Sequence, residues 1–133
     1  MAELSKEMKI VLLVNAVIAF IYAFLELIIP EIYYQLIDAP AFDIHFWRNV
    51  GGTLLVLGIF AIIAIIRADW EKVKIAFEIA IVFLIMLFIL DIVAFITITG
   101  SANWITSQVI ATIITAVLIV LDIYFYFREQ KRT

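Results

Sequence analysis

Four long apolar runs constrain the fold of this chain more than any other feature of its sequence. They cover approximately residues 10–29, 49–66, 75–99 and 104–127, and short clusters of charged residues separate them. At ~1.5 Å per residue, a helix of about 20 residues crosses a hydrocarbon core of ~30 Å. The sequence therefore predicts an all-α polytopic membrane protein whose four transmembrane helices form a bundle.

The composition agrees, since 67% of the 133 residues are hydrophobic and the mean hydropathy is +1.20. Little of the chain remains outside the spans, so we expect residues 1–133 to form a single four-helix transmembrane domain. Between the first two spans, residues 30–37 begin with a proline and gather apolar side chains on one side. This pattern predicts a short interfacial helix.

Several classes of site and partner are excluded by residue type. The net charge of −3 and the lack of a basic stripe give nucleic acid nothing to bind. There is no cysteine for a thiolate metal site, and the single histidine cannot supply a bis-histidine haem. We therefore predict no cofactor and no metal site. The expected partners are membrane lipid and either another membrane subunit or further copies of the chain.

Basic residues predict the orientation in the membrane. Eight of the nine lysines and arginines lie before the first span, between the second and third, or after the fourth, and Arg48 alone lies on the other side. The positive-inside rule then places both termini in the cytoplasm. Trp47 and Trp104 would lie at the outer interface of the cell membrane and Trp70 at the inner one, as expected for aromatic belts.

Polar residues recur at helical spacing in two of the spans. The first span carries Asn15, Ala19, Tyr22 and Glu26, at i, i+4, i+7 and i+11. The fourth carries Gln108, Thr112, Thr115 and Asp122, at i, i+4, i+7 and i+14. An ionisable side chain in the apolar zone is costly, so each of these two seams should face the interior of the bundle.

Successive spans cross the membrane in opposite directions, so the depth of each polar residue in the membrane can be compared. On this basis the polar residues fall into two groups. The predicted outer group forms a pocket for a ligand or an ion, with Arg48 above the acids, and its candidate residues are Glu26, Arg48, Asp91, Gln108, Tyr22 and His45. The predicted inner group lies near the basic residues of the cytoplasmic boundary and comprises Asn15, Glu78 and Asp122.

Most of these residues have both a structural and a functional interpretation. Asp91 is either a buried acid held by Arg48, Gln108 or a hydroxyl group, or a site for a proton or cation. Tyr22 is expected to be a hydrogen-bond partner of Glu26, and His45 an interfacial polar residue rather than a ligand. Gly51 and Gly58 share a helix face, which favours a close contact between helices. No residues form a Ser-His-Asp set, so no catalytic residues are predicted.

The order of features in the first half of the chain resembles the DoxX-like and related small four-helix membrane protein families. The matching pattern is Pro-Glu after the first span, a short stretch containing an acid, then Arg-x-x-Gly-Gly and a span with a glycine, here Pro30, Glu31, Asp38, Arg48, Gly51, Gly52 and Gly58. The resemblance implies a four-helix bundle in which the arginine meets polar groups of its neighbours. Some members are described as subunits of quinol-oxidising or thiosulfate-oxidising complexes, but no quinone or metal motif extends that role to this chain.

Two function classes follow as hypotheses. The first is a non-catalytic integral membrane protein, either a subunit of a membrane complex or a binder of lipid or another small apolar ligand in the outer pocket. The alternative is a small proton-coupled or cation-conducting transporter in which Asp91 titrates. An intramembrane enzyme acting on lipids would rest only on Asp91 and His45 both lying toward the outer side.

Overall fold

The computed structural model describes residues 3–133, and its secondary structure is almost entirely helical. The elements are α1 (Lys6–Ala23), the π-helical turn η1 (Phe24–Ile28), α2 (Pro30–Ile37), α3 (Ile44–Arg67), α4 (Trp70–Thr97) and α5 (Ala102–Arg132). Four of the helices are long and apolar enough to cross a membrane, with α1 and η1 forming one span. The predicted all-α bundle is confirmed, as is the short helix after Pro30, and the chain is a multi-pass membrane protein.

The helices extend beyond the apolar runs because capping residues fix their ends. Ser5, Asp43 and Ser101 each occupy an N-cap and accept hydrogen bonds from backbone N–H groups of the first turn. At the other ends of two helices, Asp38 after α2 and Ala68 after α3 adopt left-handed conformations, with φ of 52° and 53°. Hydropathy marks the segment that matches the membrane, whereas the caps mark the helix.

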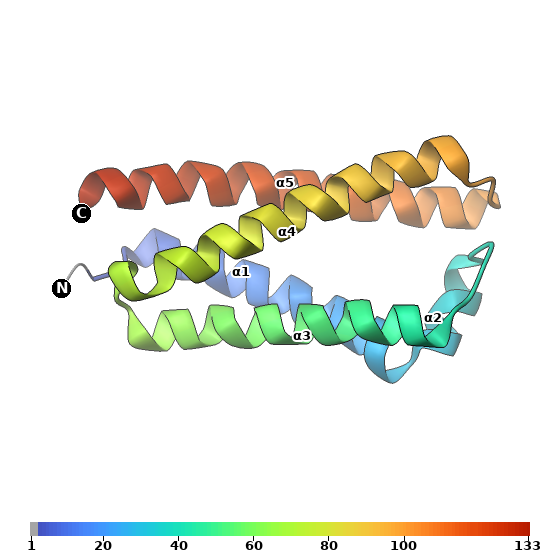
Figure 1. Cartoon of the computed structure of the whole chain (residues 1–133), viewed down its shortest axis with the longest axis horizontal. Coiled ribbons are helices and arrows are strands. Elements are labelled where there is room, and N and C mark those ends of the chain that lie inside the picture. Colours follow the sequence, from blue (N-terminus) through green and yellow to red (C-terminus); the bar gives the residue numbers. More distant parts are fainter. Residues whose placement is uncertain (1–2) are drawn as a thin grey trace.

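The long helices associate as two antiparallel pairs, α1 with α3 and α4 with α5 (Figure 1). The start of α1, the end of α5 and the α3–α4 turn lie at one end, here called the terminal end, and α2 lies at the other, here called the α2 end. The two pairs meet at the terminal end and diverge toward the α2 end (Figure 1).

Glycine allows the close approach of α3 to the first span. A Cβ atom on Gly51 would lie 2.7 Å from the backbone nitrogen of Leu27, and one on Gly58 would lie 2.7 Å from the ring of Phe20. Gly52 faces open space, with no atom within 4 Å of such a Cβ. The predicted close contact through Gly51 and Gly58 is confirmed.

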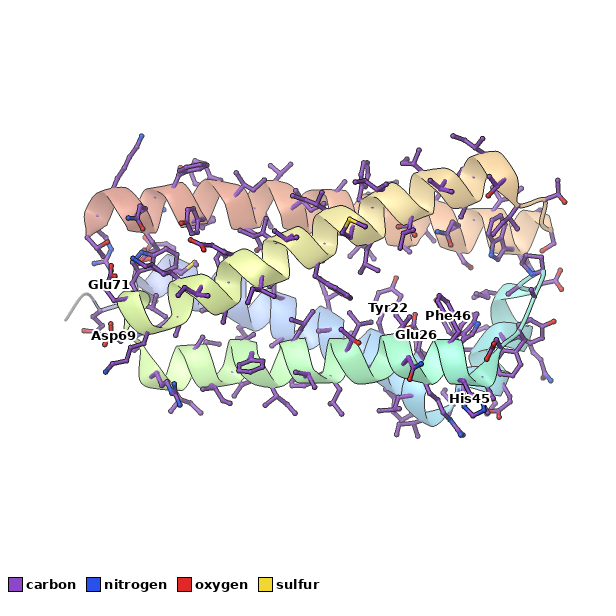
Figure 2. The ribbon with its side chains drawn as sticks, viewed as in Figure 1. Tyr22, Glu26, His45, Phe46, Asp69 and Glu71 are labelled. Carbon is purple, nitrogen blue, oxygen red and sulfur yellow. The ribbon has the colours of Figure 1, made fainter. Side chains whose placement is uncertain are left out.

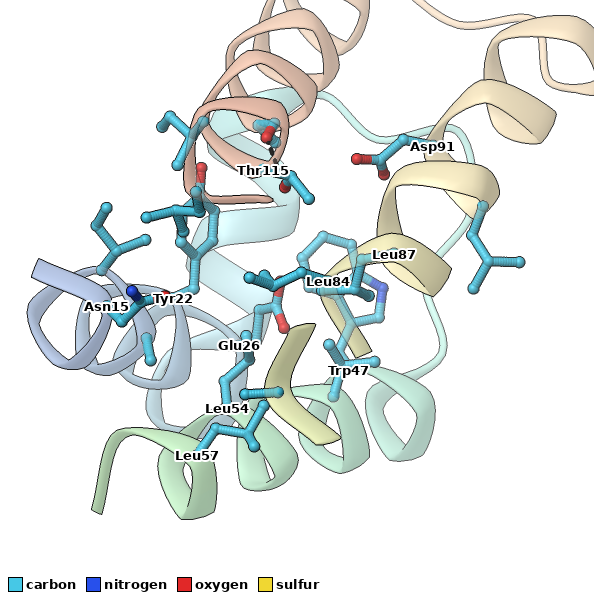
Figure 3. A pocket seen from close by; sticks show the side chains of 18 of the residues that line it. Asn15, Tyr22, Glu26, Trp47, Leu54, Leu57, Leu84, Leu87, Asp91 and Thr115 are labelled. Carbon is cyan, nitrogen blue, oxygen red and sulfur yellow. Dashed lines mark hydrogen bonds between the residues drawn. The ribbon is translucent and has the colours of Figure 1, made fainter. Parts of the chain in front are cut away.

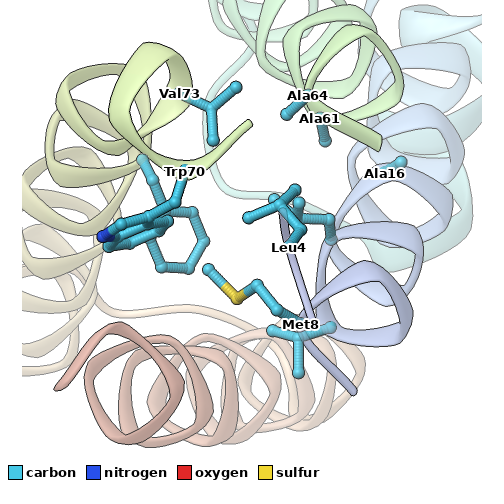
Figure 4. Close-up of a cluster of buried hydrophobic side chains, with 10 residues drawn as sticks. Leu4, Met8, Ala16, Ala61, Ala64, Trp70 and Val73 are labelled. Carbon is cyan, nitrogen blue, oxygen red and sulfur yellow. The ribbon is translucent and has the colours of Figure 1, made fainter. Parts of the chain in front are cut away.

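The hydrophobic core lies at the terminal end, where all four long helices converge (Figure 4). Met8 and Trp70 are fully buried there, beside alanines of α1 and α3. The N-terminal segment closes this end, since the backbone N–H of Leu4 donates to the carbonyl of Ala68 at 2.9 Å. The terminal end is therefore packed as a core, which leaves the α2 end to hold the space between the pairs.

Candidate functional site: a cavity between two helix pairs

A cavity of about 930 Å³ lies between the two helix pairs. Its walls come from every helix and are mostly apolar, with side chains such as Leu54 and Leu57 of α3 opposite Leu84 and Leu87 of α4 (Figure 3). Met8 and Phe77 of the core line the end of the cavity that lies against the core, here called its floor. This volume falls in the ~300–1,000 Å³ range of pockets that hold one small, largely apolar ligand.

At the α2 end, the cavity is closed by α2 and the segment that follows it, here together called the roof. Aromatic rings pack there edge to face or tilted, with centroids 5.4 Å apart for Tyr33 and Trp47 and 4.8 Å apart for Tyr34 and Phe42. The hydroxyl of Ser101 donates to the carbonyl of Asp38 at 3.3 Å, which ties the roof to the α4–α5 turn. Burial raises the pKa of Tyr33, and Tyr22 and Glu26 nearby raise it further.

The side of the cavity opens between α3 and α4. Apolar side chains of both helices line it and are also exposed at the surface, among them Val56 and Phe60 of α3, and Ile79 and Leu90 of α4. These two helices contact each other only sparsely, since α3 packs along α1 and α4 along α5. In a bilayer, this lateral mouth would face lipid chains rather than water.

One wall of the cavity carries the carboxyl group of Asp91 in a hydrogen-bonded cluster. The amide nitrogen of Gln108 donates to Asp91 Oδ1 at 2.6 Å, and the hydroxyl of Thr112 donates to Oδ2 at 3.3 Å. Gln108 and Thr112 belong to the polar seam predicted for the fourth span. Of the partners considered for Asp91, the structure therefore shows Gln108 and a hydroxyl group.

Glu26 enters the cavity from the opposite helix pair (Figures 2 and 3). It lies in the π-helical turn η1, a distortion that often occurs at functional positions. Its Oε2 atom is shielded from the surface and has no hydrogen-bond partner among the described residues. Tyr22 lines the cavity one turn before it, but no hydrogen bond joins the two side chains within residues 3–133, contrary to the expectation for Tyr22.

Arg48 and His45, by contrast, do not line the cavity, although the sequence placed them in the outer pocket. The face of α3 that lines it carries Trp47, Val50 and Leu54. Arg48 follows Trp47 by about 100° of helix rotation, so its side chain is exposed and forms no ion pair within the described chain. His45 is also exposed, and Figure 2 shows it directed away from the space between the pairs. The sequence indicated the depth of both residues but not their angle around the helix.

The predicted inner group is only partly assembled. The amide nitrogen of Asn15 donates to Asp122 Oδ1 at 2.7 Å and links α1 to α5. Asp122 has no exposed surface, and its Oδ2 has no partner among the described residues. Glu78 lies apart from this pair, exposed on α4, where it accepts a hydrogen bond from the hydroxyl of Tyr126.

Sequence reasoning missed a buried acid at the terminal end. Glu129 has no exposed surface and accepts hydrogen bonds from the backbone N–H of Ser5 at 3.2 Å and from Arg132 at 3.1 Å. Trp70 donates from its indole nitrogen to Gln130 at 3.1 Å beside it. Glu129 stands in a charged C-terminal cluster typical of solvated helix ends, so only the contact with the distant N-terminal segment reveals its role.

The described residues contain no group of three or more histidine, cysteine, aspartate or glutamate side chains that could hold a metal ion. Comparison with known proteins adds no function, since no family model, no curated protein and no solved structure matches the chain. The resemblance to the DoxX-like families therefore stays a prediction.

Proposed function

We propose that this protein is a non-catalytic membrane protein that binds one lipid or lipid-like apolar molecule in the cavity between its helix pairs. The observation that carries the proposal is the cavity itself, about 930 Å³ with mostly apolar walls and a few polar groups. Binding sites for apolar ligands combine these two properties. No catalytic step is assigned, because His45 lies outside the cavity that Asp91 lines.

The lateral mouth supports a ligand that comes from the membrane. A molecule entering between α3 and α4 passes only apolar side chains such as Val56 and Ile79. From the α2 end it would have to displace the packed aromatic rings of the roof. The route of lower cost therefore leads from the bilayer.

The orientation is part of the same proposal. With both termini in the cytoplasm of a cell, the terminal end is the inner end, and Glu26 and Asp91 lie at the level of the outer leaflet. A membrane-impermeant thiol reagent applied to intact cells tests this, because the natural chain has no cysteine. A single cysteine at position 101 should react, and one at position 133 should not.

Native mass spectrometry of the protein released from detergent micelles tests the binding. The wild-type protein should retain one apolar molecule of low mass. The variant Ala111→Phe places a ring in the cavity and should lose that molecule. Val109→Phe is the matched control, because Val109 lies on the same helix but is 40% exposed and does not line the cavity. Retention of the molecule by neither or by both variants would contradict the proposal.

A second candidate function is a small proton-coupled or cation-conducting transporter that uses Asp91. It is favoured by one observation, that Glu26, Asp91 and Asn15, the partner of Asp122, all line one continuous cavity. Vesicles containing the purified protein should then show a pH-driven flux that Asp91→Asn abolishes. Equal flux in protein-containing and empty vesicles would remove this candidate and leave the binding proposal untouched.

A further inference from the structure

The polar side chains of the cavity carry charge of one sign only. Three carboxylic acids line it, Glu26, Asp43 and Asp91, and the described lining residues include no lysine, arginine or histidine. Asp43 is engaged as the N-cap of α3, accepting from the backbone N–H groups of His45 and Phe46. Glu26 and Asp91 are therefore the acids available to a ligand.

These two acids face the same space from opposite helix pairs (Figure 3). Asp91 already accepts hydrogen bonds from Gln108 and Thr112, whereas the shielded Oε2 of Glu26 has no donor within the described chain. A shielded carboxyl oxygen without a donor is costly, so the site favours a ligand that supplies one. An anionic group placed between the two carboxyl groups would meet no compensating charge.

Beyond Glu26 the lining toward the floor carries no charged side chain and is mostly apolar, with polar groups from Tyr22, Asn15 and Thr115. Along the first span, the distance from Glu26 to Leu12 corresponds to roughly 21 Å of helix at ~1.5 Å per residue. On α4 of the facing pair, the lining from Leu87 to Phe77 is entirely apolar. A hydrocarbon chain can therefore extend from the acids to the core at the terminal end.

We propose that the cavity takes a single-chain lipid whose head group donates hydrogen bonds and carries no negative charge. The head group lies between Glu26 and Asp91, and the chain extends toward Met8 and Phe77. This assignment rests on the proposed binding function and adds the chemical class of the ligand to it. It excludes anionic phospholipid head groups from the cavity and fits long-chain alcohols and amines.

The test compares three probes with the same tail, octadecanol, octadecylamine and octadecyl phosphate, by their occupancy of the purified protein in native mass spectra. The concentration for half occupancy should be at least about tenfold lower for the alcohol and the amine than for the phosphate, which is ~1.4 kcal/mol. In Glu26→Gln and in Asp91→Asn the preference for the alcohol over the phosphate should shrink by roughly tenfold. Glu31→Gln is the matched control, because it removes the same charge from an exposed residue outside the cavity and should leave the preference unchanged.

The possible outcomes distinguish failure of the assigned ligand class from failure of the proposed binding function. Phosphate binding as tight as that of the alcohol, or a preference that neither Glu26→Gln nor Asp91→Asn alters, would overturn the assigned ligand class and leave the cavity as a binding site. Two acidic residues are tested so that failure of one variant to fold leaves the other. Binding of none of the three probes would overturn the proposed function as well.

Discussion

The hydrogen bond between Asn15 and Asp122 should stabilise the association of the two helix pairs, and its removal is predicted to be costly. Interhelical hydrogen bonds in membrane proteins contribute ~0.6 kcal/mol on average and up to ~1.7 kcal/mol. This one joins α1 to α5 at 2.7 Å, and its acceptor is a fully buried acid whose second oxygen has no partner in the described chain. Replacing Asn15 by Ala leaves that buried acid without a hydrogen-bond donor, so we expect a loss of about 1–3 kcal/mol in the free energy of unfolding.

The structure also predicts how the two partners differ. Asn15 additionally donates to the backbone carbonyl of Val11 at 3.0 Å, so Asp122→Ala leaves the amide with a partner, whereas Asn15→Ala leaves Asp122 with none. A double-mutant cycle measured by reversible unfolding in mixed micelles should give a coupling energy of about 1–1.7 kcal/mol. Thr115→Ala is the control, because its hydroxyl bonds only to its own helix at 2.9 Å and its loss should cost under ~0.5 kcal/mol. Additivity of the two single variants would refute this account of the contact.

Three further predictions concern packing, burial and ionisation. Gly51→Ala should lower the free energy of unfolding by about 1–3 kcal/mol in the same assay, because its Cβ would meet the backbone of the first span, whereas Gly52→Ala should be neutral or slightly stabilising. Glu129→Ala should cost about 1–3 kcal/mol, because it leaves the backbone N–H of Ser5 without its acceptor, whereas Glu71→Ala, whose side chain is 57% exposed, should cost under ~0.5 kcal/mol. Because burial raises the pKa of Tyr33, its neutral form contributes stability that is present below pH ~10 and lost as the pH rises through the folded-state pKa. Tyr33→Phe should therefore not reduce the tyrosinate absorbance near pH ~10, and a clear reduction would contradict the buried position.

The spans and the inward seams could be predicted because each depends on the order of residues along one helix. Hydropathy and length mark a span, and a spacing of three or four residues places Gln108 and Thr112 on one face. The contact of Gly51 with the first span followed from the same kind of pattern. Such features need no knowledge of how the helices are arranged.

A polar pocket was predicted, but the shape and extent of the cavity could not be, because they depend on the angle between helix pairs rather than on any single helix. Depth alone placed Arg48 above Asp91, but the rotation of α3 turns Trp47 toward the cavity and leaves Arg48 exposed. Glu129 gave no signal either, since its burial depends on the N-terminal segment more than a hundred residues away. Side-chain roles that need two distant segments require the fold.

The central claim is that the cavity between the helix pairs holds one lipid-like molecule. Photolabelling with an octadecanol that carries a diazirine in its chain, followed by mapping of the adducts by mass spectrometry, tests it most directly. Adducts that excess octadecanol suppresses should fall on lining residues of both pairs, such as Leu57 and Leu87, and should disappear in Ala111→Phe but not in Val109→Phe. Suppressible adducts confined to outward-facing residues, such as Ile66 and Val120, would contradict the account.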